Sequence, residues 1–402
     1  MAHIIFVLWT FILIGRPQDY FVFLEPFRLA LVFTLIALVS TLFSGNISFN
    51  TIWKSKESKL YALFYLLLIL GIPFAYHRRV AFNAIFLVYI VNIVFYCLFI
   101  INIKSADKMK DIVFVIVLCG FFYNFVGILS GSFIMGRFVT YGEMYDPNDM
   151  AFIAFALLPA SFYYLMCEKG VMKTTVSVLS IFSSILMILF TGSRAGIITF
   201  ALSFIMFFIL FKKRIKFSYF ALFIVITAIM LAWKSESINF ERFMTLGNMD
   251  NDYNVTDETG RMTIWERGFD LFLRNPITGV GVDCFPMAIG YLREGMGIIP
   301  KWQTAHNSYV QIMVETGLAG FIPYMYLIYI CISNFNKIRV GTGKEGDAEK
   351  AGIMASLFQI GFISLLFDAF FLSQGYSLLL TIYFATSVSM ENIFLSPSPG
   401  KN

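Results

Sequence analysis

The chain has 402 residues, of which 58% are hydrophobic and only 14% charged, and its mean hydropathy is +0.76. Soluble domains carry about 45–50% apolar and about 25% charged residues, so this composition excludes an ordinary soluble protein and favours lipid as the solvent. The net charge of +5 does not indicate nucleic-acid binding, because the lysines and arginines lie in short clusters between apolar runs.

Twelve apolar segments predict an all-α integral membrane protein with about twelve transmembrane helices. Their unbroken apolar runs, many near the roughly twenty residues of a span, do not show the alternation of barrel strands. The segments lie near residues 3–15, 29–44, 60–75, 81–101, 112–131, 149–166, 174–191, 196–211, 217–233, 307–333, 352–372 and 376–391. The first has no basic region before it, which predicts a retained span rather than a removed signal peptide.

The loops between these segments predict the orientation. The loops of one side hold Lys54, Lys56, Lys59, Lys104, Lys108, Lys110, Lys169, Lys173, Lys212, Lys213, Arg214, Lys216, Lys337, Arg339, Lys344 and Lys350. The short loops of the other side hold fewer positive residues, namely Arg16, Arg28, Arg78, Arg79, Arg137 and Arg194. Because positive residues are retained in the cytoplasm, we expect both termini inside the cell.

This topology predicts three parts. Residues 1–233 form a bundle of about nine spans, residues 234–306 form a long outer loop, and residues 307–402 form about three spans and a cytoplasmic tail. The outer loop is too short for a strong core of its own, so we expect it to pack on the outer face of the bundle.

Residues 261–274 of the outer loop have the spacing of an amphipathic helix. Ile264, Gly268, Leu271 and Phe272 form its apolar stripe, and Arg267 is expected to lie off that stripe. Such a helix can lie in the membrane interface.

Arginines on the predicted outer face favour an anionic ligand there. A guanidinium is a planar, permanently charged fork that suits phosphate, and pyrophosphate is a natural ligand at a bilayer surface. Arg78 follows His77, Arg194 lies in a tight Thr-Gly-Ser-Arg-Ala-Gly turn, and Arg261 begins the amphipathic helix. The alternative is that these side chains only reach toward lipid headgroups.

Two further segments place polar groups on the same face. Asp146 and Pro147 predict the cap of the sixth span, which leaves Asn148 and Asp149 able to point into a site. His306, one of three histidines, precedes Asn307 at the start of the tenth span, and a histidine can transfer protons near neutral pH. A structural role at the helix start is the alternative for this histidine.

Carboxylates are rare inside the predicted spans, where Glu315, Asp368 and Glu391 are the exceptions. A carboxylate within a span is a candidate functional residue, although it can also pair with a neighbour. We therefore include Glu315 among the candidate substrate-binding residues. The cysteines show no Cys-x-x-Cys spacing, so we predict neither a zinc site nor a disulfide framework.

Several of these motifs together resemble the bacterial O-antigen ligase and polymerase superfamily. The resemblance rests on His306-Asn307 followed by Gly317-Leu318-Ala319-Gly320, and on Ser193-Arg194-Ala195-Gly196. Gly260-Arg261 through Trp265, Asn275-Pro276 to Gly281, and Asp146-Pro147-Asn148 are similar to the family in the same order. It covers roughly residues 140–335.

The resemblance implies a GT-C-type membrane glycosyltransferase that uses a glycan linked to undecaprenyl pyrophosphate, without metal or nucleotide sugar. It implies that Arg194 and Arg261, with Arg267, bind the pyrophosphate and that His306 accepts the proton of the attacking hydroxyl. Asn148, Asp149, Asn307, Glu315 and Arg78 are expected to bind substrate. The expected partners are the lipid-linked oligosaccharide, the bilayer and a chain-length regulator, with no nucleic acid.

The function that we predict is a polysaccharide polymerase of the bacterial inner membrane. It joins repeat units on the outer face, and we favour it because polysaccharide loci carry many diverse polymerases. An O-antigen ligase that transfers the glycan to a lipid A core is the first alternative, since both enzymes share these motifs. A flippase or secondary transporter is the alternative of another class, but carriers usually place ionisable residues at the midplane and show repeats.

Overall fold

The computed structural model describes residues 1–45, 49–134, 137–140, 146–168, 170–212, 257, 259–343 and 345–395. This part of the chain is almost entirely helical, with one short hairpin of β1 (Ser132–Ile134) and β2 (Arg137–Val139). Eight of its helices are long and apolar enough to cross a membrane, and three shorter apolar helices accompany them. The chain is therefore an all-α membrane protein, as the composition predicts.

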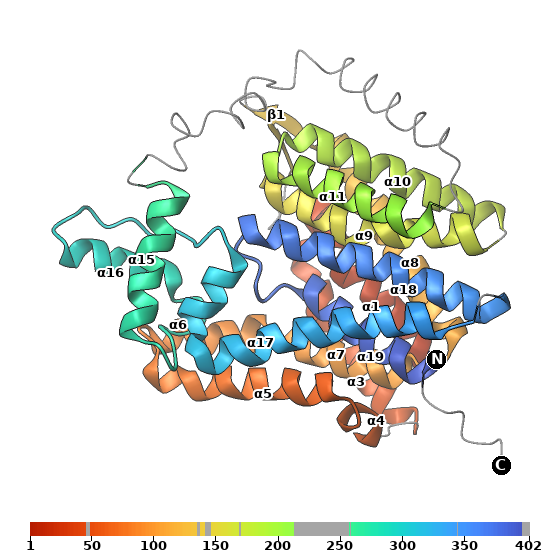
Figure 1. The fold of residues 1–402 in the computed structure, drawn as a ribbon, viewed down its shortest axis with the longest axis horizontal. Helices are drawn as coiled ribbons and strands as arrows, with labels where there is room; N and C mark the ends of the chain where they lie inside the picture. The colour runs from red at the N-terminus through yellow and green to blue at the C-terminus, as the bar shows by residue number, and fades with distance from the viewer. Residues whose placement is uncertain are drawn as a thin grey trace.

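The long helices form a single bundle, in which they run roughly along one another (Figure 1). The bundle consists of α1 (Ala2–Gly15), α3 (Leu29–Phe43), α5 (Lys56–Gly71), α7 (Ile90–Asn102), α8 (Ala106–Ser130), α9 (Pro147–Cys167), α10 (Val171–Thr191), α11 (Arg194–Phe211), α17 (Ser308–Gly341), α18 (Gly346–Asp368) and α19 (Leu378–Phe394). Every predicted span except 217–233 corresponds to one of them, although span 81–101 begins before α7, in residues 81–89. Span 217–233 lies outside the described residues.

Short elements connect or extend these helices. They are α2 (Pro17–Tyr20), η1 (Val22–Phe27), α4 (Phe49–Trp53), η2 (Ile72–Phe74), α6 (Arg78–Asn83), the π-helical turn η3 (Ala84–Val88) and η6 (Ala369–Phe371). With η3, α6 and α7 make one continuous apolar segment, Arg78–Asn102.

The bundle is held by apolar packing inside and presents apolar side chains outside. Trp9 and Phe6 of α1 are fully buried against Phe95 of α7, with ring centroids 5.6–5.7 Å apart. Large side chains such as Leu66 and Phe182 are about half exposed on the outer surface of the bundle. Because lipid is as apolar as these side chains, their exposure is expected of helices in a bilayer.

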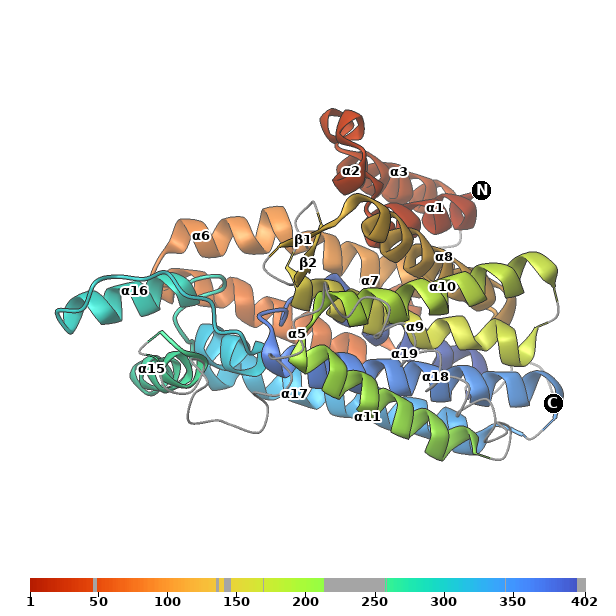
Figure 2. The ribbon, with the colours of Figure 1, turned by 90° about the horizontal axis from the view of Figure 1, so that it is seen from above.

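Two helices lie beyond one end of the bundle. These are α15 (Arg261–Arg274) and α16 (Phe285–Gly295), and they lie at the same end as α6 in both views (Figures 1 and 2). The predicted amphipathic helix 261–274 coincides with α15. Its buried residues are Ile264, Arg267, Gly268 and Leu271.

The prediction that Arg267 lies off the buried stripe is wrong, because its side chain is only 8% exposed. Arg267 is three residues after Ile264 and four before Leu271, and at 3.6 residues per turn these positions share one face. The helix packs against α17 and α16, so that face is covered by protein.

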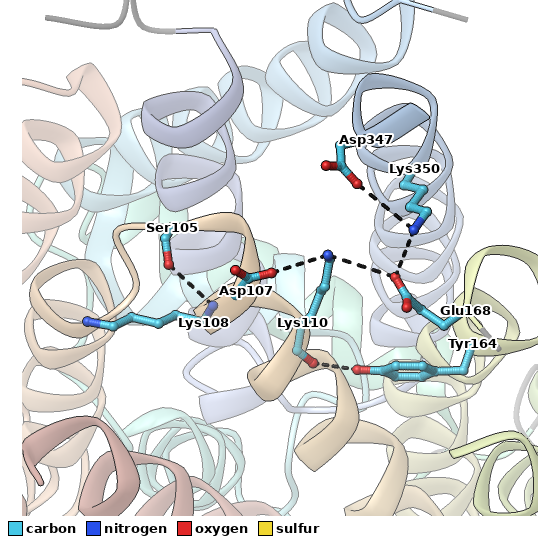
Figure 3. Close-up of polar contacts among 8 residues, drawn as sticks. All are labelled: Ser105, Asp107, Lys108, Lys110, Tyr164, Glu168, Asp347 and Lys350. Carbon is cyan, nitrogen blue, oxygen red and sulfur yellow. Dashed lines mark hydrogen bonds and ion pairs between the residues drawn. The ribbon is translucent and has the colours of Figure 1, made fainter. Parts of the chain in front are cut away.

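Ion pairs join three helix ends at the opposite end of the bundle (Figure 3). The carboxylate of Glu168, which follows α9, lies 3.3 Å from Nζ of Lys350 in α18 and 3.9 Å from Nζ of Lys110 in α8. The Tyr164 hydroxyl of α9 also donates to the Lys110 carbonyl at 2.5 Å. These contacts fix the ends of α8, α9 and α18 relative to one another.

Candidate active site

The amino ends of four helices meet at the end of the bundle that carries α15. They belong to α9, α11, α15 and α17, and most of the predicted site residues lie on them or just before them. Because unpaired N–H groups and the helix dipole make an amino end positive, four such ends favour an anion between them. The contacts that hold them together show how the site is built.

The first contact joins α9 to α11. Asn148 in the first turn of α9 accepts a hydrogen bond from the Ser193 hydroxyl, with 2.7 Å between the oxygens. Ser193 is also the cap of α11, because its hydroxyl oxygen accepts from the Gly196 amide at 3.1 Å. Arg194 follows as the first residue of α11, so the Asn148–Ser193 bond sets the position of its backbone. Asp146 caps α9 by accepting from the Asn148 amide at 2.8 Å.

The second contact joins α9 to the loop between α18 and α19. The Asp149 carboxylate accepts from the Gln374 side-chain amide at 2.9 Å. The next residue back, Ser373, accepts from the His306 backbone amide at 2.8 Å. In this way residues 373–374 connect the start of α9 to the residue in front of α17.

His306 stands in an unusual backbone conformation directly before α17. Its φ is 46°, in the left-handed region that is uncommon for residues other than glycine. The side chain is exposed, and its Nε2 lies 3.3 Å from the Thr304 hydroxyl. Such backbone strain is often found where a side chain is held for function.

Arg261 brings a fixed positive charge to His306. It is the first residue of α15, and it lies within electrostatic range of both the His306 ring and the Asp368 carboxylate. The helix is anchored here because the indole of Trp265 donates to the Ala305 carbonyl at 2.8 Å. Arg261 and His306 therefore approach each other although 45 residues separate them in the sequence.

The surroundings of His306 lower its pKa below the ordinary value of 6.5. Partial loss of water around the ring, which keeps an exposed side, is the main cause; the positive charge of Arg261 acts in the same direction, and the Asp146 carboxylate opposes them. A lowered pKa keeps the imidazole neutral near pH 7. In that state one ring nitrogen has a free lone pair and can accept a proton.

Asp368 is a buried carboxyl group behind these residues. It ends α18, is 1% exposed, and accepts from the Thr199 hydroxyl of α11 at 3.3 Å through one oxygen. Its other oxygen, Oδ2, has no hydrogen-bond partner among the described residues. Arg261 and Asp149 both lie within its electrostatic range, so Asp368 is a buried acidic group next to the arginine.

The remaining predicted residues make other contacts. Asn307 is buried and caps α17, since its side-chain oxygen accepts from the Tyr309 and Val310 amides. Arg78 is exposed at the start of α6 and donates to the Pro73 carbonyl at 3.0 Å. Arg267 is buried on α15. Substrate contacts of these side chains remain predictions.

Hydrogen bonds at a break in α17 hold residues 276–281 of the outer segment against the bundle. Gly317 interrupts the helix with φ 59° and ψ −167°. The Val280 and Gly281 amides donate to the Val314 and Glu315 carbonyls, each at 2.9 Å. On the other side of the break, the Leu318 amide donates to the Pro276 carbonyl at 2.8 Å. The backbone groups released by the break are thus paired with residues 276–281, as buried backbone groups must be.

Glu315 lies at this break and is 2% exposed. One carboxyl oxygen accepts from the Phe285 amide at 3.2 Å. Asp283 is within its electrostatic range and accepts from the Tyr89 hydroxyl of the Arg78–Asn102 segment at 2.9 Å. Burial raises the pKa of Asp283, which the Tyr89 hydrogen bond partly offsets. Glu315 therefore belongs to the contact between α16 and the bundle, and its contact with substrate remains a prediction.

Residues 179–325 match the family model described as O-antigen ligase. This stretch forms an O-antigen ligase family domain. The resemblance inferred from the motifs is thereby confirmed over these residues, which include every motif except Asp146-Pro147-Asn148. No curated protein matches the chain. The domain supports a ligase-type or polymerase-type role in O-antigen biosynthesis.

The O-antigen ligase domain contains most, but not all, of the site. Arg194, Arg261 and His306 lie inside the matched residues, whereas Asn148 and Asp149 precede them. Since Asn148 bonds Ser193 and Asp149 bonds Gln374, α9 and the α18–α19 loop complete the site from outside the domain. Among the described residues, no group of three or more His, Cys, Asp and Glu side chains is placed to hold a metal ion.

A groove with a largely apolar lining lies between α1, α3, α7 and α19. It has a volume of about 560 Å³, and its polar lining residues include Ser373, Gln374 and Arg16. Its apolar wall includes Leu31 and Leu87, which are 53% and 71% exposed on the surface of the bundle. The groove thus connects the residues that contact Asp149 and His306 with the lipid-facing surface.

Sequence reasoning missed Ser373 and Gln374 as site residues. Both are small or neutral polar residues in a loop between two spans, which is an ordinary composition for such a loop. Asp368 gave a clearer signal, because it is one of the few carboxylates at the edge of a span.

Proposed function

We propose that this protein is a polysaccharide polymerase of the bacterial inner membrane that joins repeat units carried on undecaprenyl pyrophosphate. The observation that carries this proposal is the meeting of His306, Arg261 and the Ser193–Arg194 turn at one end of the bundle, within an O-antigen ligase family domain. A base beside fixed cations is the arrangement that transfer of a glycan from a pyrophosphate needs.

In this reaction the bond between the anomeric carbon and the phosphate oxygen breaks while the acceptor hydroxyl attacks the same carbon from the opposite face. The hydroxyl proton passes to the neutral ring of His306, and undecaprenyl pyrophosphate leaves with the bonding electrons. Arg194 and Arg261, supported by the helix amino ends, stabilise the negative charge that grows on the leaving group. Attack from the opposite face inverts the configuration of the sugar.

The apolar groove between α1, α3, α7 and α19 supports a lipid-linked donor. A polyprenyl chain lying in it would bury apolar surface, and its pyrophosphate would emerge beside Ser373 and Gln374. We place this end on the periplasmic face and both termini in the cytoplasm. Lysines such as Lys110 and Lys350 gather at the other end, which agrees with the usual excess of positive residues inside the cell. A chain-length regulator is a further proposed partner.

A ligase that transfers the finished glycan to a lipid A core is the second candidate, because the O-antigen ligase domain accommodates both. Deletion of the gene, followed by gel analysis of surface polysaccharide, separates them. Single repeat units on the acceptor without a ladder are expected for a polymerase. Long chains that remain on undecaprenyl pyrophosphate, together with an acceptor that carries no glycan, indicate a ligase. An unchanged ladder contradicts both and favours a transporter.

The planar guanidinium of Arg194 can be tested by replacement with lysine. Replacing it by lysine keeps the charge but removes the planar pair of donors, so we expect Arg194→Lys to lower kcat by about 10- to 100-fold, since a factor of ten is 1.36 kcal/mol in the barrier. Arg79→Lys, at an exposed position of α6, is the matched control and should leave the rate unchanged. A rate near that of the wild type in Arg194→Lys means that this side chain only reaches toward headgroups.

The pKa of His306 predicts the pH profile. Because the neutral ring is the base, activity is lost as pH falls through its pKa, and we expect this acid limb below pH 6.5. Arg261→Gln removes the charge that lowers this pKa, so its residual activity should show the limb at higher pH. Asp146→Asn should move the limb to lower pH while keeping the helix cap. Three superimposable limbs contradict the assignment of the base.

A further inference from the structure

A second cavity lies at the opposite end of the bundle, between the start of α5 and the ends of α17 and α19. Its volume is about 710 Å³. Its polar lining combines both signs of charge, from Lys54, Lys56, Lys337, Glu57 and Glu391. The glycan-transfer reaction proposed above makes no use of this cavity.

A buried amide organises the acidic wall of the cavity. Asn334 of α17 is 1% exposed, and its side-chain nitrogen donates to Glu57 of α5 and, at 3.0 Å, to Glu391 of α19. Glu57 is itself only 2% exposed. A single amide thus holds two carboxyl groups from two different helices, and their oxygen atoms favour a cationic hydrogen-bond donor beside them.

The basic rim lies directly next to this wall. Nζ of Lys337 donates to the side-chain oxygen of Asn334 at 3.3 Å, while Lys54 and Lys56 are exposed at the start of α5. Ammonium groups in this arrangement bind phosphate as point charges. The cavity therefore offers an anionic partner and a cationic partner within one ligand-sized space.

The outer side of the cavity is aromatic and apolar. Tyr326 and Tyr329 of α17 are 48% and 66% exposed, and their rings lie nearly parallel with centroids 6.3 Å apart. They line the cavity with Ile330. In a membrane protein such tyrosines mark the level where acyl chains meet headgroups.

We propose that this cavity binds the headgroup of an aminophospholipid such as phosphatidylethanolamine. Its ammonium group faces Glu57 and Glu391, its phosphate faces Lys337, Lys54 and Lys56, and its acyl chains run past Tyr326 and Tyr329. Lysines alone would accept any anionic lipid, whereas the carboxylates select a headgroup that carries N–H donors. The cavity thus distinguishes an ethanolamine from a choline or a glycerol headgroup.

Native mass spectrometry of the delipidated full-length protein tests this site directly. The probes are phosphatidylethanolamine, phosphatidylcholine and phosphatidylglycerol, added separately. We expect the wild type to bind phosphatidylethanolamine about tenfold more tightly than either other lipid, as one charge-assisted hydrogen bond allows. Glu391→Gln should abolish this preference, and Lys337→Ala should weaken the binding of all three lipids.

Lys59→Ala is the matched control, because Lys59 is an exposed lysine of α5 that does not line the cavity. It should bind as the wild type does, and thermal unfolding should show that all variants are folded. Equal affinity for the three lipids in the wild type, or an unchanged preference in Glu391→Gln, would overturn the proposal. The outcome does not depend on glycan transfer, since binding is measured without substrate.

Discussion

His306→Asn should lower glycan transfer by about 10²- to 10⁴-fold, the usual cost of removing a general base. Asparagine tolerates the left-handed backbone at this position (φ 46°) better than most residues, so the chain path into α17 should be kept. The loss can therefore be assigned to the ring rather than to a rearranged helix start. Initial rates with saturating lipid-linked donor measure it.

The binding of donor provides the control for this variant. Because Arg194 and Arg261 are intact in His306→Asn, we expect donor affinity to change by less than about threefold, which corresponds to roughly 0.65 kcal/mol. A variant with wild-type rate would show that His306 is a structural residue at the start of α17. If donor affinity falls by as much as the rate, the His306 ring contributes to binding the donor rather than to proton transfer.

Gly317→Ala should unlock the outer segment from the bundle. A Cβ at this position would lie 2.3 Å from the Ile277 carbonyl oxygen, and the φ of 59° with ψ of −167° is essentially restricted to glycine. The contacting atom of Ile277 belongs to the backbone, and the strain at Gly317 lies in its backbone torsion angles. Neither can therefore change without a large cost in free energy. We expect at least about 1–3 kcal/mol of destabilisation from the strain alone, together with a large loss of activity.

Thermal unfolding in detergent and the rate of glycan transfer together check this prediction. Gly295→Ala is the control, because a Cβ there has no neighbour within 4 Å. We expect the Gly295 variant to match the wild type in both measurements. A Gly317 variant with an unchanged midpoint would show that residues 276–281 are held on the bundle by other contacts.

The helices could be predicted from the sequence because lipid imposes a simple rule. A span must pair all its backbone groups internally and present apolar side chains to the bilayer. The apolar runs along the sequence are therefore enough to locate helices such as α5, α8 and α18. The amphipathic spacing of 261–274 predicted α15 for a similar reason. The buried position of Arg267 was missed, because its charge obscured a helical register that it shares with Ile264 and Leu271.

The candidate site was predictable as a set of motifs but not as a set of contacts. The residue types of Arg194, Arg261 and His306 indicate phosphate binding and proton transfer, whereas the bonds from Ser193 to Asn148 and from His306 to Ser373 depend on how distant spans pack. The glycines at 279, 281 and 317 were recognised only as a family pattern. Their physical role, the pairing of backbone groups across a broken helix, requires the three-dimensional arrangement.

The most direct test of the glycosyltransferase assignment uses the purified full-length protein in vesicles with undecaprenyl-pyrophosphate-linked repeat units as the only substrate. We predict a ladder of lengthening glycans, released undecaprenyl pyrophosphate and inverted linkages. Repeat units that remain unextended without an acceptor, but are transferred once a lipid A core is added, would replace the polymerase with the ligase. Unextended repeat units with either acceptor, together with movement of the lipid-linked glycan across the vesicle membrane, would contradict the account and establish a transporter.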